Sequence, residues 1–288
     1  MIVVTGATGQ LGRRLVESLV RRVGADKVVA STRDPGKAQH LAALGVAIRH
    51  GDYEEPESLG QAFAGASQVL LVSSNAAASG GNPLAQHQKA IDAARGAGVR
   101  RIVYTSHMAA SPHSRFPPAR DHAATEAMLA ASGLRWTALR HGFYAASGLM
   151  MMGQGLGSGV VETPTDGPVA WAAHDDLAEA DAAILADEGR FDGPTPPLTG
   201  AEALDFAALA ALAADLLGRP VERKVLPDVE MPARVAARGL PPRAAEMVMG
   251  YFRAARAGEF GPADPTLESL IGNPPTPMRE VMRVALKV

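Results

Sequence analysis

The stretch TGATGQLG, residues 5–12, follows the apolar run IVVT and opens a helical pattern over residues 10–23. Three glycines at this spacing, between a strand and a helix, are typical of a dinucleotide-binding turn. Gly6 permits the tight turn, Gly9 lets the backbone approach a pyrophosphate, and Gly12 lets the helix pack close to the sheet. Amide groups at the start of the helix face the bound anion. We expect cofactor contacts from Gly6, Thr8, Gly9, Gln10, Leu11 and Gly12; the alternative is a strand–helix turn without a ligand.

Short apolar runs alternate with helical patterns over the rest of the first half. These runs are continuous rather than alternating, which indicates a parallel sheet that is buried on both faces. Strands are predicted at 2–5, 27–32, 46–50, 68–73, 100–106 and 135–141, with helices at 10–23, 56–65 and 83–98. The order of strand, helix and strand predicts an α/β fold, a doubly wound Rossmann parallel sheet.

The pattern changes after about residue 143. Residues 148–159, GLMMMGQGLGSG, indicate an irregular, mobile segment, followed by a strand at 169–173, a helix at 175–187 and mostly helical sequence from 203 onward. We predict a Rossmann domain at 1–142, with 160–200 returning to its sheet. A smaller, mostly helical lobe, formed by 143–159 and 201–288, is expected over the carboxyl edge of the sheet, where open α/β folds bind ligands.

The composition excludes several classes of function. The chain has 288 residues, 47% of them apolar, and its 28 basic and 30 acidic residues give a net charge of −2, so no nucleic-acid partner is expected. With no cysteine, disulfides, thiolate catalysis and cysteine-ligated zinc are excluded. No apolar run reaches the roughly 18 residues of a membrane span, and no secretory signal is visible. We expect a cytoplasmic protein, and a homodimer remains open.

The end of the second predicted strand bears on the choice of dinucleotide. A site for NAD usually has an acidic residue there, whereas this strand ends in Arg33 followed by Asp34. A guanidinium at this place suits the 2′-phosphate of NADP, and Lys37 lies one helical turn further on. Asp34 is expected to cap the next helix. The alternative is that Arg33 is a solvated surface charge; NADP(H) is favoured, and use of NAD(H) stays open.

Later strand ends contribute to the same predicted site. Asp52 and Tyr53 follow the third strand, where the adenine is normally flanked. The end of the fourth strand is expected to meet the nicotinamide half of the cofactor, and residues 75–83 form a candidate cover loop. The candidates from the fourth and fifth strands are Ser73, Ser74, Asn75 and Thr105.

Several motifs together resemble a known family. TGATGQLG, STRDPGKAQHLAALGV, GDYEEPESL, VLLVSS, VYTS, TEAMLAASGLRWTALRHGFY and TLESLIGNPPTPMREVM cover essentially the whole chain. They resemble the NmrA-like branch of the atypical short-chain dehydrogenases, and within it most closely the bacterial NAD(P)H:quinone oxidoreductases. The resemblance implies a cleft between a Rossmann domain and a small lobe, NADPH as cofactor, and hydride transfer to a flat aromatic acceptor. Those reductases carry Asn at the position of His141 and Trp at that of Phe143, departures that bear on the choice of acceptor.

A typical short-chain dehydrogenase uses Ser, Tyr and Lys, and this chain departs from that pattern. Alignment of the VYTS strand and the following helix places Ser106 near the usual Ser, Pro118 near the Tyr and His122 near the Lys. Proline has no acidic proton, and histidine has a pKa nearer neutrality than lysine. Ketone reduction generates an alkoxide, for which a positioned acid contributes much. Quinone reduction instead generates a phenolate comparable to that of tyrosine, with a pKa of about 10, so the departure favours quinone-like acceptors over simple ketones.

The residues on the acceptor side carry open alternatives. His122 and Glu126 lie four residues apart on one helical face, so their side chains can touch. They could act as a proton relay, orient the nicotinamide ribose, or form a structural pair. No metal site is expected, because no HExxH motif or third close ligand is present. Phe143 and Tyr144 are candidates to stack on a planar acceptor, or they pack in the core. With Ser106 they complete the predicted acceptor side.

The leading hypothesis is therefore an NADPH-dependent oxidoreductase that acts on a quinone or a similar conjugated acceptor. A non-catalytic redox sensor, which binds NADP(H) and acts through a protein partner, is the alternative from another class. An isomerase or epimerase of nucleotide sugars is disfavoured, because such enzymes usually retain the Tyr and Lys.

Overall fold

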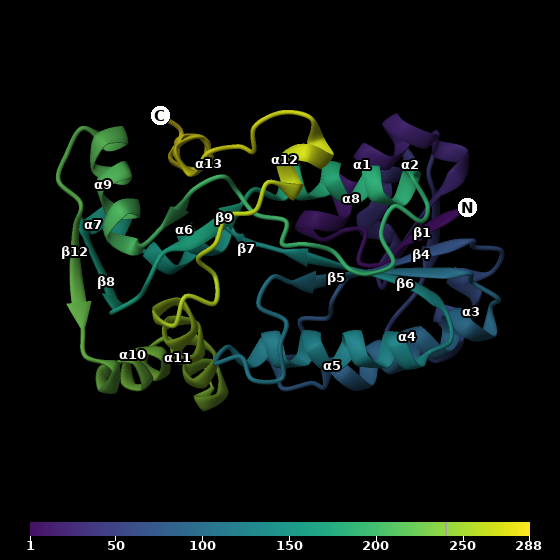
Figure 1. The fold of residues 1–288 in the computed structure, drawn as a ribbon, viewed down its shortest axis with the longest axis horizontal. Coiled ribbons are helices and arrows are strands. Elements are labelled where there is room, and N and C mark those ends of the chain that lie inside the picture. Colours follow the sequence, from purple (N-terminus) through teal and green to yellow (C-terminus); the bar gives the residue numbers. More distant parts are fainter. Residues whose placement is uncertain (240) are drawn as a thin grey trace.

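The computed structural model describes residues 1–239 and 241–288. Its centre is a seven-stranded parallel sheet in the order β10-β6-β5-β4-β1-β2-β3 (Figure 1). The strands are β1 (Ile2–Val4), β2 (Val28–Thr32), β3 (Ala47–His50), β4 (Gln68–Leu71), β5 (Arg101–His107), β6 (Arg135–His141) and β10 (Gly193–Pro194). All six strands predicted for the first half lie in this sheet, with ends within two residues of those expected. The predicted α/β class, with a doubly wound Rossmann sheet, is confirmed.

Helices cover both faces of the sheet (Figure 1). One face carries α1 (Gln10–Val23), α8 (His174–Ala186) and α12 (Thr266–Ile271), and the other carries α3 (Pro56–Phe63), α4 (Pro83–Gly96) and α5 (Pro117–Ala131). Neighbouring strand residues point to opposite faces, so Val4 packs in the core beside α1 while Val3 packs in the core beside α3. The continuous apolar runs thus serve two cores at once.

The turn after β2 is capped as predicted. Asp34 precedes a 3-10 helix at Pro35–Ala38, and its Oδ1 accepts the Gly36 N–H at 3.1 Å. A short helix, α2 (Gln39–Ala42), follows. Two smaller sheets form away from the central one: β7 (Phe143–Tyr144), β9 (Val169–Ala172) and β11 (Ala203–Leu204) make three strands, and β8 (Val160–Pro164) pairs with β12 (Glu222–Leu226).

The second half packs around an apolar core that is rich in aromatic residues such as Trp171, Tyr251 and Phe260, and Phe116 joins this core from the first half. Its helices are α9 (Phe206–Leu217), α10 (Met231–Ala237), α11 (Pro242–Arg256) and α13 (Met278–Leu286). Within the segment 160–200, β10 joins the central sheet and α8 packs against α1 on one face of that sheet. The strands β8 and β9 pair with strands outside the central sheet. The division into two lobes stays a prediction. Within the described ranges, no helix is long and apolar enough to cross a membrane.

Residues 148–159 are not irregular, and this expectation was wrong. They form most of α6 (Ala145–Met152) and all of α7 (Gly155–Ser158). The glycines that suggested a loop permit close packing instead: a Cβ at Gly148 would lie 3.1 Å from the Trp171 ring, and one at Gly155 would lie 2.7 Å from the carbonyl oxygen of Val160. Gly153, with a φ of +51°, separates the two helices.

Candidate functional site

The glycine turn lies at the carboxyl end of β1, where β4 and β2 flank it. Gly6 has a φ of +58°, and a Cβ at Gly12 would lie 2.3 Å from the carbonyl oxygen of Gly6. Helix α1 starts at Gln10 without a side-chain cap or an acidic residue in its first turn. Gly6, Gly9 and Gln10 are exposed, Thr8 is half-buried, and Leu11 and Gly12 are buried. The Gly9 N–H is bonded to the Gly6 carbonyl oxygen at 2.9 Å within the turn. The turn therefore presents the uncapped N-terminus of α1 to an anion.

Arg33 and Lys37 stand beside this turn, at the end of β2. The hydroxyl oxygens of Thr8 and Thr32 lie 3.1 Å apart, which joins the glycine turn to β2. Arg33 is exposed, and its guanidinium has no hydrogen-bond or ion-pair partner in the part of the chain that the structure describes. Lys37 is also exposed and lies 3.5 Å from Asp34. Recognition of a 2′-phosphate by Arg33 and Lys37 stays a prediction.

Tyr53 joins the ends of two strands below the turn. Its hydroxyl donates to the carbonyl oxygen of Val72 at 2.7 Å and lies 2.6 Å from Thr5 Oγ1. Thr5 Oγ1 in turn accepts the Val72 N–H at 2.9 Å. Burial raises the pKa of the Tyr53 hydroxyl. Tyr53 thus holds the end of β1 against the end of β4. The sequence predicts a contact of Tyr53 with the adenine and does not indicate this structural role.

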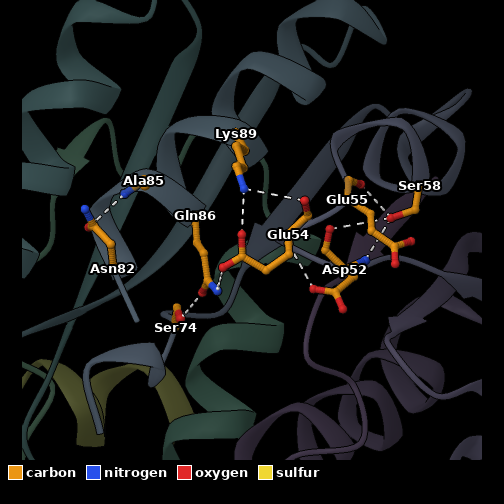
Figure 2. A network of polar contacts seen from close by, with 9 residues as sticks. All are labelled: Asp52, Glu54, Glu55, Ser58, Ser74, Asn82, Ala85, Gln86 and Lys89. Carbon is orange, nitrogen blue, oxygen red and sulfur yellow. Dashed lines mark hydrogen bonds and ion pairs between the residues drawn. The ribbon is translucent and has the colours of Figure 1, made fainter. Parts of the chain in front are cut away.

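A polar network joins the loop after β3 to the end of β4 (Figure 2). Gln86 on α4 donates from Nε2 to Glu54 at 2.7 Å and accepts the Ser74 hydroxyl at Oε1. Lys89 binds the second oxygen of Glu54 at 2.6 Å, and this contact lowers the pKa of the Glu54 carboxyl. Asp52 shapes the loop itself, since its Oδ1 accepts the Glu54 N–H at 2.9 Å. Helix α4 therefore holds both predicted cofactor segments in place.

His87, also on α4, supports the same strand end from inside the fold. Its Nε2 accepts the Ser74 N–H at 2.9 Å, so the ring proton is on Nδ1, which contacts Thr125 Oγ1 at 2.8 Å. Burial lowers the pKa of His87 to about 4. The neutral ring is thus held in one tautomer, and it positions the Ser74 backbone.

The predicted nicotinamide residues come together at the ends of β4 and β5. The Ser73 N–H donates to Thr105 Oγ1 at 2.8 Å, and the Thr105 hydroxyl donates to Ser73 Oγ at 3.2 Å. Asn75 is exposed at the start of the next turn. Ser73 and Thr105 are therefore joined directly, whereas Ser74 is held by Gln86 and His87; contacts of these residues with the cofactor stay a prediction.

The Ser106 hydroxyl is already hydrogen-bonded within the protein and is not available to an acceptor. Its hydroxyl donates to Glu126 Oε1 at 2.6 Å, and Arg140 Nη2 binds the other oxygen of Glu126 at 2.7 Å. Ser106 and Glu126 are buried. These hydrogen bonds connect β5, α5 and β6, so Ser106 is part of a structural network.

His122 turns away from Glu126 to another partner. Its Nδ1 forms a hydrogen bond of 2.8 Å with the Tyr104 hydroxyl, and its ring stacks on His107 at 5.9 Å. Burial holds the pKa of His122 well below its usual value, so the ring is neutral. The relay between His122 and Glu126, one of the alternatives for this helix, is not formed in the structure.

Phe143 and Tyr144 are half-buried and face different surroundings. The Phe143 ring lies 4.9 Å from that of Tyr251. The Tyr144 ring lies 4.4 Å from that of His174, and its hydroxyl is 3.4 Å from Nδ1 of His141. His141 Nε2 is paired with Asp181 at 2.9 Å, with both side chains buried. Stacking of either ring on an acceptor stays a prediction. Among the described residues, no group of three ligating side chains could hold a metal ion.

Comparison with known proteins decides the family. Residues 6–188 match the family described as NAD(P)H-binding. The chain is 37% identical to quinone oxidoreductase 2 of Escherichia coli (strain K12) over 281 residues, which cover 97% of this chain and 96% of that protein. The chain belongs to the NmrA-like NAD(P)H-binding family. The resemblance carried by the sequence motifs is thereby confirmed.

Two solved structures of similar proteins contain the cofactor. The NADPH-dependent quinone oxidoreductase of Escherichia coli complexed with NADPH has a TM-score of 0.92 and 36% identity, over 99% of this chain and 100% of that one. The triphenylmethane reductase of Citrobacter sp. complexed with NADP(H) has a TM-score of 0.88 and 33% identity, with the same coverage.

The residues of this NmrA-like chain fit NADP(H). The space beside Gly12 is closed by backbone, and the exposed turn at Gly6 and Gly9 leaves the amide groups of α1 accessible for a pyrophosphate. Arg33, which is exposed and has no ion-pair partner among the described residues, supplies a cation at the neighbouring strand end. Sequence reasoning missed Glu54, Gln86 and His87, because isolated polar residues on a helix or loop carry no motif.

Proposed function

We propose that the chain is an NADPH-dependent oxidoreductase that transfers hydride to a quinone or a similar conjugated acceptor. The observation that carries this proposal is the whole-length similarity to quinone oxidoreductase 2 of Escherichia coli, at 37% identity. The glycine turn, the free helix N-terminus and the exposed Arg33 support NADPH as the partner. We further propose a small-molecule acceptor as the other partner, with no nucleic acid, and a cytoplasmic location.

The side chains of the site support this choice of acceptor. Bound NADPH supplies the hydride, and the protein holds the acceptor against it and excludes water. Pro118 stands where a typical short-chain dehydrogenase has its acid, and the Ser106 hydroxyl is bound to Glu126. His122 is neutral and bound to Tyr104. Such a site offers little acid assistance, which suits an acceptor whose reduced oxygen is a stabilised phenolate.

The test is NADPH consumption by the purified protein with a panel of quinones, aldehydes, ketones and imines. We expect turnover with quinones, little with simple ketones, and less with NADH than with NADPH. Binding of NADPH is measured in parallel by fluorescence. Tight binding of NADPH without turnover on any acceptor would favour the redox sensor over the enzyme.

A further inference from the structure

His107, the last residue of β5, carries a buried hydrogen-bond donor that the fold does not use. The Ala109 N–H donates to its Nδ1 at 3.1 Å, so the proton of the neutral ring is on Nε2. Nε2 is buried and has no hydrogen-bond partner among the described residues. Burial lowers the pKa of His107 to about 3, which keeps the ring neutral and this N–H in place at ordinary pH.

Aromatic rings surround this donor. The ring centroids of Phe116, Phe143 and Phe260 lie 5.7, 5.5 and 5.6 Å from that of His107. Phe116 and Phe260 are buried, whereas Phe143 is half-buried. His107 also adjoins Ser106 at the carboxyl edge of the sheet, which is the edge that binds the cofactor in this fold. The donor therefore lies in an apolar surrounding next to the expected position of the acceptor.

A buried donor without a partner is unfavourable and rare. The rings of Phe143 and Phe260 stand at 85° and 79° to the imidazole, and such edge-to-face ring contacts offset only part of this loss. The hydrogen bond from the Ala109 N–H accounts for Nδ1, and a phenylalanine would lose it. Among the described residues, no contact accounts for the unsatisfied Nε2–H on the other side of the ring.

We propose that the Nε2–H of His107 donates a hydrogen bond to the acceptor oxygen on which negative charge develops. This inference rests on the proposed function. A quinone that receives a hydride gains two electrons and one proton and becomes a hydroquinone monoanion, while NADPH becomes NADP⁺; water supplies the second proton, and His107 keeps its own. Phe143, the half-buried ring of the three phenylalanines, is the one that an acceptor would displace beside Nε2.

Two variants isolate this N–H. His107→Phe keeps a planar ring and removes the donor, whereas His107→Gln places an amide N–H near the position of Nε2. Both lose the contact with the Ala109 N–H, so they are matched in that respect. With benzoquinone, we expect kcat/KM to fall about 10- to 100-fold in His107→Phe, as for the loss of one hydrogen bond to a charged oxygen, and to be largely retained in His107→Gln. The dissociation constant of NADPH should stay the same in both.

A binding measurement tests the contact without turnover. In wild-type protein with NADP⁺ bound, no hydride is available, and the histidine N–H resonances can be followed by NMR. Naphthoquinone should shift the Nε2–H resonance of His107, whereas naphthalene, which has the same rings but no oxygen, should not.

The outcomes separate this inference from the proposed function. Wild-type kcat/KM in His107→Phe, equal losses in both variants, or equal NMR shifts with the two ring compounds would each overturn it. A wild-type protein that consumes no NADPH with any acceptor would overturn the proposed function. In that case the NMR comparison still decides whether His107 binds a carbonyl oxygen.

Discussion

Acidification should destabilise the fold through His87, the neutral histidine that accepts the Ser74 N–H. Burial lowers its pKa from 6.5 to about 4. Because the folded pKa lies below the unfolded one, the associated stability is complete above about pH 6.5 and is lost as the pH falls towards 4. The variant His87→Gln retains an acceptor for the Ser74 N–H and does not titrate.

The magnitude follows from the two pKa values. At about pH 5 the His87 ring is protonated in nearly every unfolded chain but in only about a tenth of the folded chains. His87 therefore lowers the free energy of unfolding by about 2 kcal/mol at this pH. At about pH 7.5 neither state is protonated, and the cost is close to zero. The other buried histidines titrate in both proteins and cancel in the comparison.

The assay is urea unfolding of wild-type protein and His87→Gln at the two pH values. The free energy of unfolding of the wild type should fall by about 2 kcal/mol more than that of the variant on acidification. His113→Gln, at an exposed position, serves as the control and should follow the wild type. A constant difference between wild type and His87→Gln at both pH values would refute the reasoning.

Three further substitutions test other parts of the site. Arg33→Ala should weaken NADPH binding about 10- to 100-fold and leave NADH binding unchanged; equal weakening in fluorescence titrations would show that Arg33 does not read the 2′-phosphate. Asp181→Ala should lower the free energy of unfolding by about 1–3 kcal/mol, because it leaves the buried Nε2 of His141 without its partner, whereas Asp187→Ala, exposed near the end of the same helix, should change it little. Urea unfolding that gives the two aspartate variants equal stability would contradict this. Gly12→Ala should destabilise by about 1–3 kcal/mol and weaken NADP(H) binding, since its Cβ meets backbone at 2.3 Å. Gly60→Ala, whose Cβ meets nothing within 4 Å, should instead stabilise α3, and a similar loss in both glycine variants would count against close packing at Gly12.

The fold could be predicted from the sequence where local pattern and burial agree. The inner strands β1, β2 and β4 are continuous buried runs because both faces of the sheet are covered there. Local pattern gives the wrong structure for residues 148–159, because glycine is common in loops. At Gly148 and Gly155 the missing side chain instead admits Trp171 and the backbone at Val160, which are contacts that local sequence does not reveal.

The same distinction holds for the site. The glycine turn is local and has a specific spacing, so its position after β1 could be predicted. The partners of Ser106 and His122 could not: helix spacing pairs Glu126 with His122, yet Glu126 binds Ser106 and Arg140, while His122 binds Tyr104. Several polar side chains lie within reach of each of these residues, and tertiary packing determines which of them forms the hydrogen bond. Helix spacing alone does not identify that partner.

The central claim is hydride transfer from NADPH to a quinone, and a single-turnover experiment tests it most directly. Protein with bound NADPH is mixed with benzoquinone while NADPH absorbance and hydroquinone formation are followed together. We predict that NADPH is lost in step with hydroquinone formation, with one hydroquinone formed for each NADPH oxidised. NADPH that stays bound and unoxidised in the presence of the quinone would contradict the account.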